Sequence, residues 1–203
     1  MSHKIIILFS LLFVLLISCE SNKTSDETQF AESVEDIEVF QTVYAEGICE
    51  IQVPDYFVEM DDVNEFALIQ TGYIAEPDAE DIIIDDEIYA IVLVDYKNEI
   101  EKVYGDSIQM SLLDFNGLTI QNLDYILEDL TVGIENPIIQ EQNGLKNIHN
   151  EFYGRLGEYL IYYQTSIYET EIGFYRVLTW CMQDHLTKHK SEMYKITSSF
   201  KEL

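Results

Sequence analysis

The sequence predicts an α+β fold in which an antiparallel sheet of about six strands is sandwiched between helices. The main observation is residues 157–182, GEYLIYYQTSIYETEIGFYRVLTWCM, which read as two long strands joined by a turn near residues 169–171. Side chains alternate across a strand, and here both alternating sets are mainly apolar. An antiparallel sheet with one face in water would alternate apolar and polar residues instead. Both faces of this hairpin therefore need a cover, which helices can supply.

The side chains of this hairpin are assigned to opposite faces. Aromatic residues with strand alternation are typical of a core, although the tyrosines with Trp180 could also line a ligand cleft. In the first strand one face holds Tyr159, Ile161, Tyr163 and Ile167, and the other holds Leu160, Tyr162 and Tyr168. In the second strand one face holds Ile172, Phe174, Leu178, Trp180 and Met182, and the other holds Tyr175, Val177 and Cys181.

The N-terminal residues have the pattern of a secretory signal. Lys4 supplies a positive charge, and the apolar run of residues 5–17 is too short for a comfortable transmembrane helix. The end of this run, Leu-Ile-Ser-Cys at residues 16–19, resembles the lipobox of bacterial lipoproteins. In that class a diacylglycerol group is attached to the Cys and the signal is cut before it. We therefore expect residues 1–18 to be a signal peptide and Cys19 to be the lipid anchor; an ordinary cleaved signal and an uncleaved anchor are the alternatives.

The anchor also predicts a location in the cell envelope. More than one acyl chain gives stable membrane attachment. Glu20 follows the Cys, where an Asp would resemble an inner-membrane retention signal, so the outer membrane of a Gram-negative cell is favoured, facing the periplasm or the surface. We expect residues 19–43, which are polar and acidic, to form a flexible tether, and residues 44–203 to form a single domain.

The charge balance limits the classes of partner. The chain has 11 Lys and Arg against 38 Asp and Glu, a formal net charge of −27. Such a surface repels phosphate backbones, so we expect no nucleic-acid partner. It also disfavours direct adsorption to anionic lipid. A protein partner in the envelope, and contact with the membrane through the lipid, remain the expected interactions.

The folded region is predicted to begin with three strands. Residues 47–54 form the first, residues 66–74 the second, and residues 88–96 the third, which is continuous in apolar residues and therefore central. Residues 97–105 are predicted to turn the chain.

Helices and further strands complete the predicted order. Residues 107–130 read as helical, with a break at Asn116-Gly117 and a new cap at Thr119. A strand is expected at residues 145–153, before the double-faced hairpin. Asp184 is expected to cap a final helix. One face of that helix holds Leu186, Met193, Ile196 and Phe200.

Several segments together resemble the PsbP-like family. These are VPDYF, YAIVLVDYK, YLIYYQ, FYRVLTWC and the C-terminal KITSSFKEL. The family includes the extrinsic PsbP subunit of photosystem II, a Ran-binding nuclear import factor and bacterial lipoproteins. The resemblance covers residues 48–203 and implies an α/β/α sandwich with a non-catalytic binding or accessory role. The resemblance assigns no functional residue to this chain.

Two groups of residues, one acidic and one containing histidines, are candidate metal sites. The loop of residues 75–87 could bind Ca²⁺ through its carboxylates, but it lacks the Gly and closing Glu of an EF-hand, so a solvated loop is favoured. His185, His189 and Glu192 have the spacing of a zinc site, but Lys188 and Lys190 beside them oppose a dication. We therefore predict no metal and no cofactor. The loop carboxylates are Asp78, Glu80, Asp81, Asp85, Asp86 and Glu87.

Arg176 is the one candidate ligand-binding residue. It falls on the apolar face that holds Phe174 and Leu178. A half-buried Arg usually has a carboxylate partner, and it could also hold an anionic ligand. The lysines at positions 188, 190, 195 and 201 could form a partner-binding patch, but local balance of acidic surface is the preferred interpretation.

The remaining cysteines and the catalytic motifs give little more. Cys49 and Cys181 lie in strand-like runs, where a buried thiol is favoured over a disulfide between them. The sequence has no G-x-S-x-G, P-loop or G-x-G-x-x-G motif, and no evident nucleophile and base grouping. We therefore expect a binding protein; a Ca²⁺-dependent module and, less favoured, a hydrolase are the alternatives.

Overall fold

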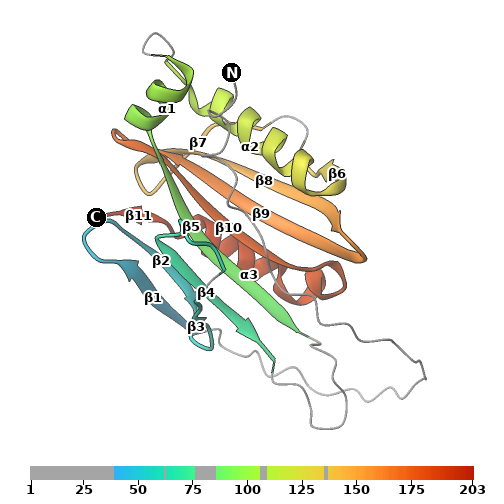
Figure 1. Ribbon diagram of the computed structural model, residues 1–203. Helices are drawn as coiled ribbons and strands as arrows, with labels where there is room; N and C mark the ends of the chain where they lie inside the picture. The colour runs from blue at the N-terminus through green and yellow to red at the C-terminus, as the bar shows by residue number, and fades with distance from the viewer. Residues whose placement is uncertain (1–38, 62, 76–85, 106–108, 135–136) are drawn as a thin grey trace, which may run out of the picture.

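The computed structural model describes residues 39–61, 63–75, 86–105, 109–134 and 137–203. These residues form an α+β fold with two antiparallel sheets (Figure 1). Among the described residues, none of the helices is long and apolar enough to cross a membrane.

The larger sheet has eight strands, in place of the six or so that the sequence predicted. Its path runs β3-β4-β5-β10-β9-β8-β6, and β7 also pairs with β8. The extra strands are short and lie at the edges, where they bury little apolar surface and so leave a weak pattern. The strands are β3 (Val58–Glu59), β4 (Ile69–Ile74), β5 (Glu87–Tyr96), β6 (Glu128–Val132), β7 (Gln140–Gln142), β8 (Leu145–Leu156), β9 (Tyr159–Glu169) and β10 (Gly173–Met182).

The predicted double-faced hairpin is confirmed as β9 and β10. Residue Tyr168 pairs with Tyr175, and the turn is closed by a backbone hydrogen bond of 2.9 Å from Thr170 N–H to Gly173 C=O. One face of the hairpin packs in a core with Met193 and Ile196, and the other packs with Leu123. Helices therefore cover both faces, as the apolar alternation required.

Three helices form these covers (Figure 1). Helices α1 (Lys97–Tyr104) and α2 (Leu112–Ile126) contact β5, β8, β9 and β10 from one side. Helix α3 (Leu186–Ser198) packs on β9 and β10 from the other side. The result is the predicted arrangement of a sheet between helices.

Helix α2 differs from its prediction at both ends and in its middle. It begins at a capping box, in which the Ser111 hydroxyl accepts from Asp114 N–H and the Asp114 carboxylate accepts from Ser111 N–H. It continues without a break through Asn116-Gly117, because the Asn116 side chain is buried and accepts a 2.8 Å hydrogen bond from Asn150. Thr119 is not a cap, since its hydroxyl donates to Phe115 C=O within the helix.

Two neighbouring segments also differ from their predictions. Residues 97–104 form the short helix α1 where a turn was expected, because three apolar residues in eight give too weak a period to recognise. Leu130, which was expected in the helix, lies in strand β6, and this strand pairs with β8.

The last helix begins without the predicted cap. Asp184 lies in the 3₁₀ turn η2 (Gln183–His185), and no side chain caps the start of α3 at His185. Phe200 lies beyond the helix end but still packs in the core, with its ring centroid 4.8 Å from that of Tyr168 and 4.9 Å from that of Tyr175. The predicted apolar set is therefore buried, apart from the half-buried Leu186.

A second sheet packs beside α3 and was not predicted as separate. It has the order β1-β2-β11, with β1 (Phe40–Ala45), β2 (Cys49–Pro54) and β11 (Lys201–Glu202). Strand β1 contains residues 40–43, which the sequence assigned to the tether. The folded domain thus begins at about residue 40, while Cys19 and the tether up to residue 38 lie outside the described residues.

Candidate functional site

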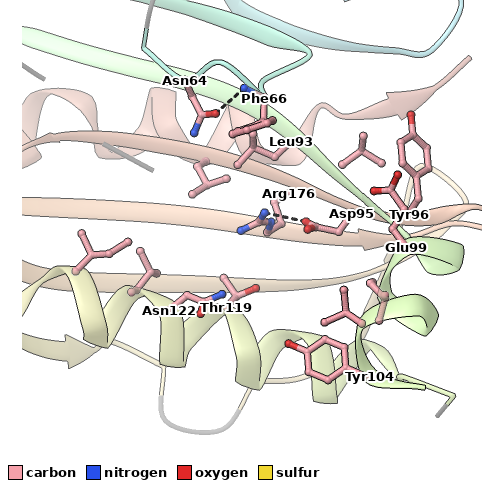
Figure 2. Close-up of a pocket in the computed structure, with 16 residues that line it drawn as sticks. Asn64, Phe66, Leu93, Asp95, Tyr96, Glu99, Tyr104, Thr119, Asn122 and Arg176 are labelled. Carbon is pink, nitrogen blue, oxygen red and sulfur yellow. Dashed lines mark hydrogen bonds and ion pairs between the residues drawn. The ribbon is translucent and has the colours of Figure 1, made fainter. Parts of the chain in front are cut away.

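A cleft lies between α1, α2 and the face of the large sheet that these helices cover (Figure 2). Its volume is about 270 Å³. The figure shows Arg176 and Asp95 at its centre, with Thr119 and Asn122 of α2 on one side and Leu93 on the other. The lining residues are Asn64, Phe66, Leu93, Val94, Asp95, Tyr96, Glu99, Ile100, Val103, Tyr104, Thr119, Asn122, Leu123, Ile126, Arg176 and Leu178.

Arg176 has the carboxylate partner that the sequence led us to expect. Its Nη2 atom lies 2.8 Å from Asp95 Oδ2, and the Arg176 side chain is 17% exposed. The guanidinium carbon also lies 5.8 Å from the centroid of the Phe115 ring. The ion pair and the aromatic face stabilise a charge that would otherwise be costly on an apolar sheet face.

The pairing of β5 with β10 brings these two residues together. Arg176 stands opposite Leu93 in the register, so Asp95, two residues further along β5, points to the same face and is a diagonal neighbour. The contact is a single ion pair and lacks the geometry of a hydrogen bond: Arg176 Nε and Asp95 Oδ2 are buried atoms without a hydrogen-bond partner. Among the described residues that line the cleft, only these two carry such an atom.

The rim of the cleft is apolar and open to solvent. Phe66 is 61% exposed, Val103 is 53% exposed and Tyr104 is 40% exposed. Exposed apolar groups that cluster around a hollow are typical of binding sites. The cleft therefore combines an apolar mouth with one charged pair at its inner wall.

The cleft contains no residue that sequence reasoning had proposed, apart from Arg176. The tyrosines of β9 and β10 do not line it: Tyr162, Tyr168 and Tyr175 are core residues on the opposite face, and Tyr163 packs with Trp180. Glu99 and Tyr104 were missed because they come from a segment that was expected to be a turn, and Tyr96, which ends the strand before it, was not singled out.

Residues from both candidate metal sites, the acidic loop and the last helix, meet in one buried cluster on the other side of the sheet. His189 is 1% exposed, and its Nε2 lies 2.5 Å from Asp86 Oδ1 while its Nδ1 lies 2.7 Å from Glu192 Oε2. Lys188 also bonds Asp86, and the Tyr56 hydroxyl donates to Glu192 at 2.6 Å. Because both ring nitrogens face carboxylates, His189 is a doubly protonated cation that donates to both.

The pKa values of this cluster shift in the directions that such pairing predicts. Burial by itself lowers the pKa of His189, but the hydrogen bonds to Glu192 and Asp86 outweigh it and raise the pKa above 6.5. Burial raises the pKa values of Asp86 and Glu192, but Lys188, His189 and Tyr56 reverse this, so both lie below their usual values. The group is a satisfied ion network.

The ion network contains residues that were candidate metal ligands. Among the described residues, no group of three or more His, Cys, Asp or Glu could hold a metal ion. Asp86 is committed to His189 and Lys188, and Glu87 accepts a 2.7 Å hydrogen bond from the Tyr89 hydroxyl. The other four carboxylates of the acidic loop, Asp78, Glu80, Asp81 and Asp85, lie outside the described residues.

The lysines of α3 and the C-terminus balance acidic surface locally, as preferred from the sequence. Lys188 pairs with Asp86, Lys190 with Glu151 at 2.9 Å, and Lys201 with Glu50 at 2.9 Å. Lys195 lies over the Phe40 ring, 5.5 Å from its centroid.

The two cysteines of the domain are buried free thiols and form no disulfide. Burial raises the pKa of Cys49 to about 11 and the pKa of Cys181 to about 12. Cys181 Sγ lies 3.7 Å from Met193 Sδ in the core, so it behaves as a small apolar residue.

Comparison with known proteins identifies the fold. No protein-family model and no curated protein sequence matches the chain. Among solved structures, cyanobacterial PsbP (CyanoP) from Synechocystis sp. PCC 6803 matches with a TM-score of 0.52 and 13% identity, over 86% of this chain and 98% of that chain. At this identity the match shows the fold, which is PsbP-like, as the sequence resemblance implied.

Two weaker structural matches were also found. LpqN from Mycobacterium tuberculosis, described as involved in cell envelope biogenesis, matches with a TM-score of 0.48 and 11% identity, over 83% of this chain and 87% of that chain. PA94 from Pseudomonas aeruginosa, of unknown function, matches with a TM-score of 0.45 and 8% identity, over 75% and 89%.

Proposed function

We propose that this chain is a lipid-anchored protein of the outer membrane whose PsbP-like domain is a non-catalytic binding module. The observation that carries the proposal is the cleft, where the Arg176–Asp95 pair lies among apolar walls behind an exposed rim. A concave, mainly apolar site with a few polar groups is the usual form of a small-ligand site.

The chemistry of the lining supports binding over nucleophilic catalysis. The described residues that line the cleft include no Ser, Cys, His or Lys, and the hydroxyl of Thr119 donates to Phe115 C=O. A nucleophile and an adjacent base are what covalent catalysis requires. The hollow therefore suits recognition of a ligand or of a partner's side chain.

The location rests on the N-terminal signal and Cys19. Metabolic labelling with an alkyne-tagged fatty acid should label the wild type and fail to label Cys19→Ala, which should also leave the membrane fraction. Cys49→Ala is the matched control and should keep the label, because its thiol is in the core. Label on Cys19→Ala would refute the anchor.

The binding role is tested by a ligand-observed NMR screen of a mixed fragment library against the full chain in lipid nanodiscs. Wild type is compared with Phe66→Ala, a rim substitution, and with Ile138→Ala, an exposed apolar substitution outside the cleft. Hits that weaken with Phe66→Ala and persist with Ile138→Ala support the proposal. The proposal would be refuted by fragments that bind Phe66→Ala as well as wild type, or by a screen that finds no binding fragment.

A further inference from the structure

Strand β1 forms an open edge of the small sheet (Figure 1). The Asp55 N–H donates to Val39 C=O at 2.9 Å, and hydrogen bonds alternate along an antiparallel pair, so the odd-numbered residues of β1 face β2. The N–H and C=O groups of Phe40, Thr42 and Tyr44 therefore point away from β2. Among the described residues, no other strand bonds these groups.

This edge lacks the features that usually protect an edge strand, which are short length, charge, proline and bulges. Strands β3 and β11 have two residues each, and β7 has three with Glu141 at its centre. Strand β6 contains Glu128 and Asp129 and has a register shift. In contrast, β1 has six residues, FQTVYA, with no charge, proline or register shift, in a chain of which 24% is charged. Among the described strands, β1 is therefore the edge best suited to pairing.

The sequence of β1 is complementary to a second copy of itself. With a twofold axis at Thr42, the outward groups of Thr42 in the two copies bond each other, and Phe40 of each copy stands opposite Tyr44 of the other. Aromatic pairs and Thr–Thr pairs are among those that stabilise a sheet. On the other face Gln41 stands opposite Val43, so no like charges meet along the strand. In this register every outward N–H and C=O of β1 is bonded.

The groups that make these contacts are accessible to a second strand. Tyr44 is 65% exposed, and Thr42 is also exposed. The half-buried Phe40 already packs against the core, with Lys195 Nζ 5.5 Å from the centroid of its ring. Tyr44 of the second copy would thus contact a side chain that is already held in place, which lowers the entropy cost of association.

We propose that two copies of this chain associate through antiparallel pairing of their β1 strands, which joins the two small sheets into one. This inference does not depend on the cleft. Six residues a side are few beside the roughly 20–30 of a stable interface, so the pairing is weak in solution. It is favoured where the proposed lipid anchor holds copies at one membrane, because confinement raises their effective concentration.

Disulfide trapping tests the register. The full chain is placed in liposomes and oxidised, and dimers are measured on non-reducing gels; the buried Cys49 and Cys181 do not compete. In the proposed register the two Cα atoms of residue 42 lie about 5.5 Å apart, whereas those of residue 44 lie roughly 14 Å apart. Thr42→Cys should therefore give at least about fivefold more dimer than Tyr44→Cys, the matched exposed control, whose Cα separation is beyond disulfide range.

A proline substitution tests the backbone hydrogen bonds. Thr42→Pro removes an N–H that points to the open side, so the bonds between β1 and β2 remain. Energy transfer is measured in liposomes between donor- and acceptor-labelled full chains that carry the dye at Ile138→Cys, an exposed position outside β1. Transfer should fall to the level of random collision with Thr42→Pro and persist with Thr42→Ala, which keeps the N–H. Circular dichroism melting confirms that each variant is folded.

Salt provides an independent check, because two chains of net charge −27 repel each other. Screening weakens that repulsion, so energy transfer between wild-type copies should rise with ionic strength. A fall with ionic strength would show an association held by opposite charges and would overturn pairing through the uncharged β1.

Two other results would also overturn the inference. Equal dimer yields from Thr42→Cys and Tyr44→Cys would indicate random collision, as would transfer that is unchanged by Thr42→Pro. A Thr42 thiol that is shielded from a thiol reagent without forming dimers would mean that this edge is covered by another segment of the chain or another protein. None of these results changes the test of the cleft, which rests on Phe66→Ala.

Discussion

Replacing His189 with Leu should destabilise the domain strongly, although His189 is far from the cleft. The imidazolium is 1% exposed and bonds Asp86 and Glu192 at 2.5 and 2.7 Å. Removing one partner from a buried ion network leaves the other charges uncompensated, which costs about 3–5 kcal/mol. His185→Leu is the matched control on the same segment: its ring is 27% exposed and 3.9 Å from Asp86, so the cost should stay below about 1 kcal/mol.

The pH dependence of stability provides the second half of this test. The pKa of His189 is raised on folding, so its contribution is full below about pH 6.5 and is lost as the pH rises through the higher, folded value. The pKa values of Asp86 and Glu192 are lowered, so their contributions are present above 3.8 and 4.5 and are lost as the pH falls further. The network is therefore most stabilising between about pH 4.5 and 6.5.

Urea unfolding followed by Trp180 fluorescence measures both effects. The wild type should lose stability between pH 6 and 9, and His189→Leu should be lower throughout and flatter over that range. If His189→Leu costs no more than His185→Leu, or if the wild-type curve is flat above pH 6, the ion-network explanation fails.

Four further predictions concern a helix cap, two glycines and the buried thiols. Ser111→Ala removes the capping box of α2 and should lower the free energy of unfolding, measured with urea, by about 1 kcal/mol. Thr131→Ala is the control, because Thr131 is an exposed strand residue outside any cap, and it should lower that free energy by less. Equal losses would contradict the role of the cap. Gly117→Ala should stabilise by about 0.5–1 kcal/mol, because a Cβ there meets no atom within 4 Å in a helix. Gly72→Ala should instead cost about 1–3 kcal/mol, because its Cβ would lie 2.7 Å from Ile88 C=O, and a stable Gly72→Ala would show that β4 and β5 are further apart. Cys49 and Cys181 should resist a thiol reagent at pH 8 until urea is added, since burial raises their pKa values to about 11 and about 12; rapid labelling of the native chain would show that the core opens.

The sequence predicted the centre of the fold better than its edges. The hairpin of β9 and β10 and the strand β5 carry long apolar alternation, which follows from burial on both faces. Strands β3 and β11 have two residues each and leave no such pattern. The continuity of α2 through Asn116-Gly117 depends on the hydrogen bond from Asn150, a long-range contact that no local rule contains.

The candidate site was predictable only in part, for the same reason. A half-buried Arg176 implied a carboxylate partner, but the choice of Asp95 among 38 acidic residues depends on the register of β5 against β10. The acidic loop and the histidines of the last helix appear as separate metal candidates in the sequence, because Asp86 and His189 are 103 positions apart and their contact leaves no local pattern.

The final residues of the chain complete a layer that begins near the start of the domain. Lys201 and Glu202 pair with Glu50 and Cys49, and Leu203 N–H donates to Ile48 C=O at 3.0 Å. Synthesis makes β2 long before β11, so one edge of β2 stays unpaired until residues 201–202 have been made. Trimming even three residues from the tail would leave that edge permanently open for another chain to pair with.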